Sequence, residues 1–193
     1  MTHRQFIEKL GDTPVIAAVK SDEDLTAALT ETDIGIIFIL YGDVVTLPEI
    51  TARVRKAGRS AFVHIDLVSG LSVKDEAAVD YVKRFTEADG IITTRSNISA
   101  HAREIGLNTV LRFFVIDSKA VNNIKRLANE HVQPDVIEIM PGVVSPDIIT
   151  EIDGLSRVPV LAGGLVRTRE ECMRALSAGA TAVSTTNRKL WQA

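Results

Sequence analysis

The sequence contains little cysteine, no long apolar run and no strong excess of either charge. Cys172 is the only cysteine, so no disulfide can form within the chain, which favours a cytosolic protein. The longest apolar stretch, from Ile34 to Tyr41, is far below the roughly 18 residues that a membrane span needs. The first residues, MTHRQFIEKLGD, lack the apolar segment of a signal peptide. We therefore expect a cytoplasmic protein without membrane contact.

The overall composition is that of an ordinary globular chain. Hydrophobic residues make up 46% and charged residues 24% of the 193 residues. A chain of this length buries about 70% of its unfolded surface, so it needs neither disulfide nor metal to fold, and disorder and fibrous structure are excluded. The net charge of −3 argues against indiscriminate nucleic-acid binding but leaves room for a local basic patch. No Pro/Gly/Ser-rich linker divides the chain, so we expect a single domain over residues 1–193.

Short apolar runs alternate with longer segments of helical character. The runs are rich in Val, Ile and Phe and nearly continuous in apolar character, which is typical of parallel strands covered on both faces. They occupy residues 14–20, 34–40, 61–66, 89–94, 109–116, 135–140, 158–162 and 180–185. Within the fifth run, Phe113 and Phe114 are interpreted as core residues. The alternation predicts right-handed crossovers and a parallel sheet.

Helix boundaries are marked between these runs. Four helix starts are predicted, at Ser21, at Ser72, at Ser145 with Pro146 in the first helical position, and at Thr168 with Glu171 completing a capping box. Three helix ends are predicted just before strands, at Gly58, Gly106 and Gly179. The helix after Asn187 is expected to be very short or missing.

Eight strand–helix units favour a compact (β/α)8 TIM barrel, an α/β fold, with short loops. The alternative is an open doubly wound sheet. The number of strands and the pattern of the last two units favour the barrel. In a barrel the functional face lies at the carboxyl ends of the strands, where the candidate site residues are therefore sought.

A phosphate site is predicted after the last two strands. Gly163 and Gly164 follow the seventh strand, and Ser184, Thr185 and Thr186 end the eighth. Glycine has no Cβ, so backbone N–H groups can approach an anion closely, and a helix N-terminus adds oriented donors. Loops seven and eight of a barrel frequently bind phosphate. The alternative interpretation is that the two glycines merely form a tight turn.

Four charged residues interrupt apolar strands, namely Lys20, Asp66, Arg112 and Glu138. Strand side chains alternate in direction, so each could point into the barrel mouth. Buried charges are costly unless paired, so these residues should pair with one another or bind a ligand. In the functional interpretation the carboxylates accept hydrogen bonds from a hydroxylated ligand while Lys20 and Arg112 bind its anionic end or orient the carboxylates. In the structural one they form an ion-pair network.

Other reactive side chains form no recognisable catalytic pattern. His64 is expected to be a buried histidine with a local partner, and Cys172 a packed small side chain. The remaining histidines have no metal-ligand spacing, and neither a nucleophile elbow nor a Walker loop is present. We therefore predict no catalytic residue, no metal and no cofactor.

Several segments in chain order resemble the glycerol-3-phosphate responsive antiterminator family. The most specific are the His-Ile-Asp-Leu stretch at residues 64–67, the Glu-Ile-Met-Pro-Gly stretch at 138–142 and the Ser-Thr-Thr-Asn stretch at 184–187. Further resemblance covers residues 89–94, 112–118 and 162–168, so that nearly the whole chain is included. The Gly-Gly loop alone is shared by many barrels.

The resemblance implies a regulator rather than an enzyme. Members of this family bind glycerol 3-phosphate and act on the messenger RNA leader of glycerol-catabolism genes, where they prevent premature termination. The expected partners are therefore glycerol 3-phosphate as effector and the mRNA leader, and a homo-oligomer is possible. Composition and spacing alone would not indicate an RNA function.

RNA binding by a chain of net charge −3 requires a local basic surface. Two groups of basic residues are candidates. The preferred group borders the predicted ligand loops and consists of Arg167, Arg169, Arg188 and Lys189. The alternative group consists of Arg53, Arg55, Lys56 and Arg59.

Two other functions remain open from the sequence. A phosphate-substrate barrel enzyme, such as an isomerase or lyase, could use Lys20 as a Schiff-base lysine and Asp66 or Glu138 as general base. The short loops count against this alternative because they leave no long lid to exclude water. A metabolite-binding module without RNA contact is the third hypothesis. Turnover of phosphorylated substrates would separate the enzyme from the other two.

Overall fold

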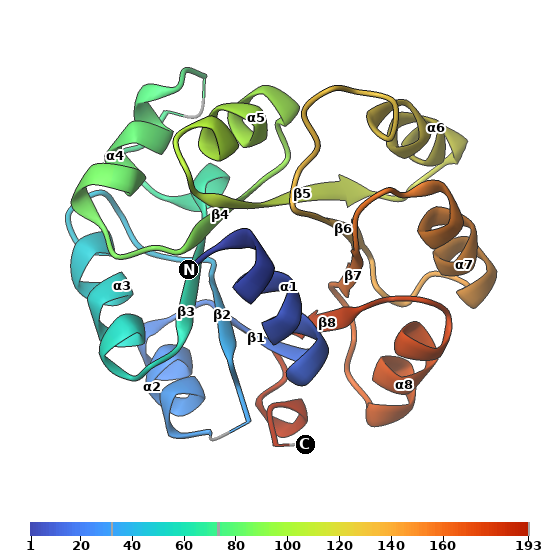
Figure 1. The fold of residues 1–193 in the computed structure, drawn as a ribbon. Helices are drawn as coiled ribbons and strands as arrows, with labels where there is room; N and C mark the ends of the chain where they lie inside the picture. The colour runs from blue at the N-terminus through green and yellow to red at the C-terminus, as the bar shows by residue number, and fades with distance from the viewer. Residues whose placement is uncertain (32, 73, 193) are drawn as a thin grey trace.

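Eight parallel strands close into a barrel in the computed structural model, which describes residues 1–31, 33–72 and 74–192 (Figure 1). Each strand pairs with the next in the chain, and β1 pairs with β8 to complete the ring. The strands are β1 Val15–Val19, β2 Ile36–Ile39, β3 Ser60–His64, β4 Gly90–Thr93, β5 Asn108–Phe114, β6 Val136–Met140, β7 Val160–Gly163 and β8 Ala182–Thr185. The prediction of a closed (β/α)8 barrel rather than an open sheet is therefore confirmed.

Seven helices form the crossovers between consecutive strands. They are α2 Asp22–Thr30, α3 Leu47–Lys56, α4 Ala77–Phe85, α5 Ser96–Glu104, α6 Ser118–Leu127, α7 Pro146–Leu155 and α8 Arg169–Ser177. A 3-10 turn, η1 Ile65–Leu67, follows β3, and another, η2 Arg188–Leu190, follows β8. The prediction that the last helix is very short or missing is confirmed.

The predicted helix boundaries are mostly correct. Ser21 caps α2 by accepting from the Asp24 N–H, and Thr168 and Glu171 form a complete capping box at α8. Ser145 stands at the N-cap of α7 without a side-chain cap bond. The start predicted at Ser72 is wrong, because α4 begins only at Ala77.

The three predicted helix ends are confirmed by positive φ angles. These are 73° at Gly58, 78° at Gly106 and 113° at Gly179, each one residue beyond a helix C-cap. Such angles are easily adopted only without a Cβ.

An additional helix, α1 His3–Asp12, precedes the barrel and was not predicted. Figure 1 shows it lying across the end of the barrel nearest the viewer. Thr2 and Gln5 form a capping box at its start, and Phe6 and Leu10, four residues apart, face the barrel and are fully buried. The Phe6 ring packs on that of Phe62 with 4.5 Å between centroids. The amino end of the barrel is thus closed by an apolar plug.

Side chains inside the barrel form two layers: an apolar layer next to α1, and a polar layer nearer the carboxyl ends of the strands. Beneath α1, the interior is filled by side chains from all eight strands, among them Ile16, Phe38 and Phe62. Because side chains alternate along a strand, residues two positions further on also face inward, one layer nearer the carboxyl end. In β5 and β6 that step leads from Val110 and Val136 to the charged pair described below.

Two further apolar clusters lie between the barrel and the surrounding helices. Phe113 packs partly buried against one of them, as predicted, and Cys172 is buried there. The core assignment of Phe114 is wrong: its side chain is 55% exposed, because Phe114 lies at the open carboxyl end of β5, beyond the buried layer. Among the described residues, no helix is long and apolar enough to span a bilayer.

Candidate ligand-binding site at the barrel mouth

A cavity of about 290 Å³ opens at the carboxyl ends of the strands. Its lining includes six of the residues predicted for the site, from three different loops and two strands: Lys20, Arg112, Gly164, Ser184, Thr185 and Thr186. Arg167, which was predicted for the RNA surface, also lines the cavity. Six further lining residues were not predicted as site residues and are mainly apolar: Ala18, Leu40, Met140, Leu165, Val166 and Asn187. The cavity is at the end of the barrel where functional sites of this fold lie.

A buried ion pair forms the floor of the mouth. Arg112 Nε donates to Glu138 Oε2 at 2.7 Å, and the two side chains are 8% and 0% exposed. Ser184 Oγ donates to the other carboxylate oxygen of Glu138 at 2.5 Å. Both carboxylate oxygens of Glu138 are therefore bonded to protein partners, and the group is enclosed. Arg112 uses only Nε among the described residues, so its two terminal nitrogens are left for a ligand.

The two glycines at the end of β7 have different surroundings. Gly163 faces the interior, where an added Cβ would overlap the Glu138 carboxylate and the Ser184 hydroxyl. Gly164 has a φ of 78°, and an added Cβ would lie 2.5 Å from Met140 Cε. Gly163 therefore makes room for the buried network, whereas Gly164 makes the turn that lines the cavity.

The turn after β8 is fixed by bonds from its side chains. Thr185 Oγ1 donates to the Val166 carbonyl at 2.8 Å, and the Asn187 amide donates to the Arg167 carbonyl at 2.7 Å. These bonds connect the turn to the loop that follows β7. Thr186 is exposed at the cavity, and its hydroxyl has no partner among the described residues.

Lys20 and Asp66 do not join the buried ion pair. Lys20 is exposed at the cavity rim, and its backbone N–H donates to Asp24 Oδ2 at 3.1 Å. Asp66 lies in η1, where it accepts from Thr93 Oγ1 at 2.8 Å and from the Thr94 N–H at 2.8 Å. The chain leaves β3 at His64, so Asp66 ties η1 to the end of β4. Of the four charged residues, the structure pairs only Arg112 with Glu138.

His64 is buried at the end of β3 and faces the same layer as the ion pair. Burial and the nearby Arg112 charge lower its pKa to about 4, although Asp66 acts in the opposite direction. The imidazole is therefore neutral at physiological pH. Its Nδ1 has no hydrogen-bond partner among the described residues.

The two basic groups differ in how far their charges are compensated. Arg188 is held by α2, with Nη1 2.9 Å from Glu23 and Nη2 2.7 Å from Asp24. The side chains of Arg167, Arg169 and Lys189 are exposed and form no ion pair among the described residues.

In the alternative group, Arg53 pairs with Asp22 on the neighbouring helix, and Arg55 lies 3.0 Å from Asp89. Arg59 donates to the Glu31 carbonyl. No cluster of metal-ligating side chains occurs within the described ranges.

The chain matches the family model described as "Glycerol-3-phosphate responsive antiterminator" over residues 15–191. It belongs to this family. The crystal structure of a glycerol uptake operon antiterminator regulatory protein from Listeria monocytogenes is 33% identical, with a TM-score of 0.86 and coverage of 93% of this chain and 95% of that one.

Two further relatives are similar over nearly the whole chain. A glycerol uptake operon antiterminator-related protein from Thermotoga maritima is 34% identical, with a TM-score of 0.80 and coverage of 93% and 98%. The uncharacterized protein YgcP of Escherichia coli is 39% identical over 187 residues, which cover 96% of this chain and 95% of that protein. The family and both solved relatives carry the names of regulators.

The family motifs that are far apart in the sequence converge at the mouth. The Gly142 N–H donates to the carbonyls of Gly163 and Gly164 at 2.5 and 3.0 Å, so the motif at 138–142 holds the loop after β7. Glu138 from the same motif accepts from Ser184 in the motif at 184–187. Sequence reasoning overlooked Met140 and Asn187 in the cavity lining; their position at the ends of β6 and β8 could have indicated them.

Proposed function

We propose that this antiterminator-family protein senses glycerol 3-phosphate in the mouth cavity and binds the leader of an mRNA for glycerol catabolism, where it prevents premature termination. The observation that carries the ligand part is the convergence of Lys20, Arg112 and the Gly164 turn on one cavity in a chain of this family. Such a regulator acts in the cytoplasm, where the transcript is made.

The phosphate is placed on the turns after β7 and β8. In this proposal the backbone N–H groups of Gly163, Gly164, Ser184 and Thr185 donate to it, and the Thr186 hydroxyl adds a further donor. Two observations support the use of backbone rather than side chains at residues 184 and 185. The Ser184 hydroxyl is bonded to Glu138, and the Thr185 hydroxyl is bonded to the Val166 carbonyl.

Two of the three cations that line the mouth, Arg112 and Lys20, receive different roles in ligand binding. Arg112 lines the cavity, and its free guanidinium nitrogens suit an anionic or hydroxylated ligand. Glu138 is fully enclosed, so it acts as a positioning residue that holds Arg112. Lys20 supplies a second positive charge at the rim. Asp66 holds η1 and β4 beside the site.

A path from the ligand to the preferred basic group runs through Asp24. One oxygen of this carboxylate accepts from the backbone of Lys20, which lines the cavity, and the other accepts from Arg188. In this proposal, ligand binding at Lys20 shifts Asp24 and thereby the group Arg167, Arg169, Arg188 and Lys189, which contacts RNA. The ligand must then bind the RNA-competent form more tightly than the other form.

The ligand site is tested with Gly164→Val. Valine at a φ of 78° next to Met140 should displace the turn and prevent close approach of the phosphate. The matched control is Gly106→Val. Gly106 has the same φ as Gly164, but it follows the C-cap of α5 and lies outside the cavity. We expect the control to lose stability but keep its response to glycerol 3-phosphate in a thermal shift series that includes glycerol and inorganic phosphate.

The size of the response is set by linkage. A ligand at 100 times its dissociation constant stabilises the folded protein by about 2.7 kcal/mol. This stabilisation should occur with glycerol 3-phosphate in the parent and disappear in Gly164→Val. Equal stabilisation of a folded Gly164→Val variant would refute this placement of the phosphate.

The RNA part is tested by matched charge reversals. Arg188→Glu with Lys189→Glu should weaken binding of the leader RNA while sparing glycerol 3-phosphate, whereas Arg53→Glu with Lys56→Glu should not. The comparison is balanced because Arg53 and Arg188 both pair with acids of α2. RNA binding should also fall with salt, at a slope of about −0.7 per phosphate contact. If Arg53→Glu with Lys56→Glu weakened RNA binding more than the other pair, the RNA surface would be assigned to the alternative basic group.

The enzyme alternative is checked on the same preparation. Schiff-base lysines are desolvated to keep the amine neutral, whereas Lys20 is exposed at the rim. Turnover of glycerol 3-phosphate or a related phosphate, together with RNA binding that no ligand or variant changes, would replace the regulator by the enzyme.

A further inference from the structure

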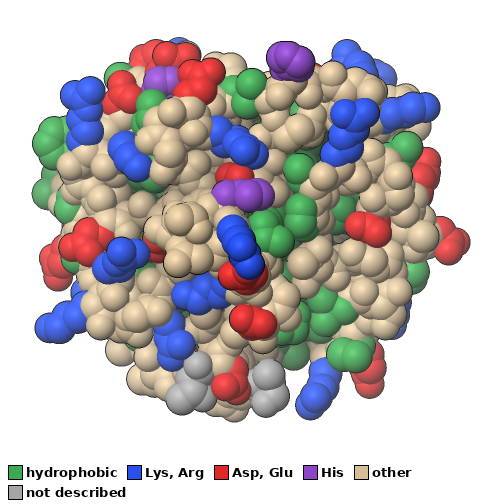
Figure 2. Space-filling view, viewed as in Figure 1, with side chains coloured by type: hydrophobic (Ala, Val, Ile, Leu, Met, Phe, Trp, Pro, Cys, Tyr) green, Lys and Arg blue, Asp and Glu red, His purple; other side chains and the backbone are tan. Residues whose placement is uncertain are grey.

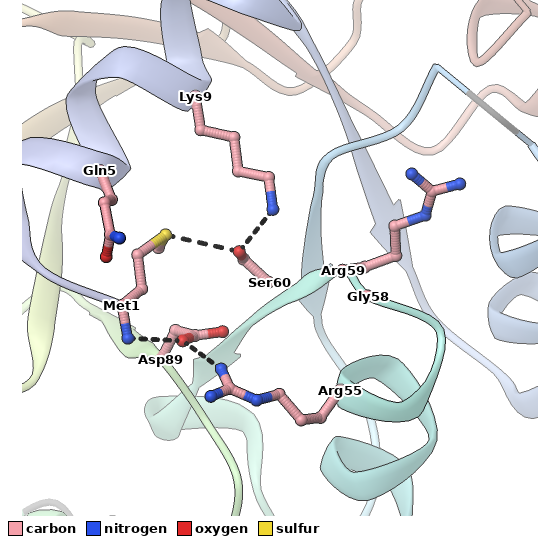
Figure 3. Close-up of a pocket in the computed structure, with 8 residues that line it drawn as sticks. All are labelled: Met1, Gln5, Lys9, Arg55, Gly58, Arg59, Ser60 and Asp89. Atoms are coloured by element: carbon pink, nitrogen blue, oxygen red, sulfur yellow. Dashed lines mark hydrogen bonds and ion pairs between the residues drawn. The ribbon is translucent and has the colours of Figure 1, made fainter.

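A second polar cavity lies at the opposite end of the barrel from the mouth. It has a volume of about 470 Å³, within the usual range of small-ligand pockets. Its wall includes α1, the end of α3 and the segments that enter β3 and β4 (Figure 3). The mouth lining, in contrast, comes from the carboxyl-terminal parts of strands and from the loops that follow them. The two cavities are therefore separate.

Cations outnumber carboxylates in this second cavity. Lys9, Arg55 and Arg59 line it, and Asp89 is the only acidic residue of the lining. Asp89 is already bound: it accepts from Arg55 at 3.0 Å, from the amino group of Met1 at 3.1 Å and from the Ala61 N–H at 3.1 Å. One enclosed carboxylate thus faces three side-chain cations. Figure 2 shows this face, where Lys and Arg side chains lie beside acidic ones near its centre.

Lys9 lacks a paired counter-charge in this cavity. Its Nζ donates to Ser60 Oγ at 2.9 Å, and it forms no ion pair among the described residues. Burial lowers the pKa of Lys9 below its usual value; the Asp89 charge opposes this effect, while Arg59 and Arg55 add to it. An ammonium group that is partly desolvated beside two guanidinium groups gains free energy when an anion enters.

Arg59 leaves a second donor without a partner. Its Nη2 donates to the Glu31 carbonyl at 2.8 Å, but its Nε is buried and has no partner within the described part of the chain. In Figure 3 its side chain lies on the far side of Ser60 from Asp89, at the edge of the pocket. The Ser60 hydroxyl lies between Lys9 Nζ, from which it accepts, and Met1 Sδ, to which it donates at 3.4 Å. Ammonium, guanidinium and hydroxyl donors around one cavity match the oxygens of a phosphate group.

We propose that this cavity at the amino end of the barrel is a second phosphate-binding site, in which Lys9, Arg55 and Ser60 hold a phosphate group at a place independent of the mouth. The phosphate belongs to a free phosphorylated small molecule or to the backbone of a single-stranded RNA, and both present the same oxygens. The site does not depend on glycerol 3-phosphate binding at the mouth.

The test is a titration of the full chain followed by the backbone amide resonances. Inorganic phosphate is one probe, and a short single-stranded RNA without terminal phosphates is the other. Glycerol 3-phosphate is left out of these titrations, because its own phosphate would compete with both probes for this site, and the amides at the mouth are followed separately. The parent should show shifts at Gly58, Ser60 and the amide of Lys9 with at least one of the two probes.

The variants decide whether the cations cause the binding. Lys9→Met keeps the aliphatic stem but removes the charge, and Arg55→Met leaves Asp89 its bonds to Ala61 and Met1. Each should weaken binding about tenfold or more, the usual effect of losing a hydrogen bond to a charged group. The control is Lys125→Met on α6, which is exposed and removes the same charge elsewhere.

The outcomes distinguish a phosphorylated small molecule from RNA as the source of the phosphate, and they test the second site separately from the mouth site. Shifts with phosphate that vanish in Lys9→Met assign a small-molecule site. Shifts with RNA that vanish in Lys9→Met assign an RNA contact, and the dependence of RNA affinity on salt should then fall in slope by about 0.7 in this variant. Absence of shifts at these amides with both probes, or equal loss in Lys125→Met, would overturn the second site. The mouth proposal fails separately, when mouth amides do not respond to glycerol 3-phosphate.

Discussion

At the amino end of the barrel, Phe6 and Leu10 of α1 cover an apolar layer, whereas at the carboxyl end the same strands enclose Arg112 and Glu138. The two layers are only one alternation apart along β5 and β6. Apolar burial stabilises the first layer directly. The second contains charges that must leave water, and their attraction compensates for this only while both partners are present.

The difference shows where stability and function are separated in this barrel. The layer under α1 has no polar group to offer a ligand, and the polar groups at that end lie off-centre, around Lys9 and Asp89. At the mouth, one member of the ion pair remains open to the cavity while the other is enclosed. Variants at the two ends should therefore differ in whether they change folding, binding or both.

The largest effect is expected from deleting a buried side chain of α1 at the amino end of the barrel. Phe6→Ala removes a fully buried ring that packs on Phe62, so the free energy of unfolding should fall by about 3–5 kcal/mol. Chemical unfolding measures this loss. Phe114→Ala makes the same deletion at an exposed position near the mouth and should cost less than about 1 kcal/mol. Similar losses in the two variants would show that α1 does not close the barrel as described.

Removing one partner of the buried ion pair should cost at least about 3 kcal/mol. Glu138→Gln keeps the shape but leaves the Arg112 charge uncompensated in an enclosed layer. It should also weaken ligand binding, because Arg112 loses the carboxylate that positions its guanidinium group. The double variant Arg112→Met with Glu138→Gln should recover part of the stability but none of the binding. The free energy of unfolding is measured by denaturant titration. A Glu138→Gln variant as stable as the parent would contradict a buried ion pair between Glu138 and Arg112.

The smallest of the three effects is a pH dependence from His64. Its pKa is about 4 in the folded protein and near 6.5 when unfolded, so between these values the unfolded chain binds a proton that the folded one does not. The contribution is fully present above pH 6.5 and is lost as the pH falls towards 4, by roughly 3 kcal/mol at most.

Unfolding of the parent and of His64→Gln at a series of pH values isolates this contribution from that of the carboxylates. The free energy of unfolding of the parent should fall more steeply between pH 6.5 and 4 than that of the variant. Parallel curves would show that His64 is protonated alike in both states.

Much of the barrel was predictable because its signals are local. The apolar runs located all eight strands to within a few residues, and the capping box at Thr168 and the glycines after α3, α5 and α8 marked real helix boundaries. Two boundary signals misled. Ser72 resembles an N-cap, but the helix begins at Ala77, and Phe114 continues an apolar run beyond the point where the strand is covered.

The candidate site was predictable in its residue types but not in its pairings. Charges within apolar strands indicated a polar layer, and Arg112 and Glu138 do form it. Asp66 follows the same pattern in sequence, yet the chain turns into η1 after His64 and carries Asp66 to Thr93 and Thr94. Periodicity describes a strand only as far as the strand continues.

The sequence by itself determined the order of the eight strands and of the helices between them, and it indicated the two loops that line the mouth, because these follow from the period of apolar residues and from glycine and capping residues at fixed offsets. It favoured the closed barrel over an open sheet through the number of strand–helix units. Only the tertiary structure decided that α1 covers one end, that Arg188 is held by α2, and that Lys9, Arg55 and Asp89 share a second cavity. These contacts join residues far apart in the chain, and their geometry is set by closure of the barrel rather than by any local pattern.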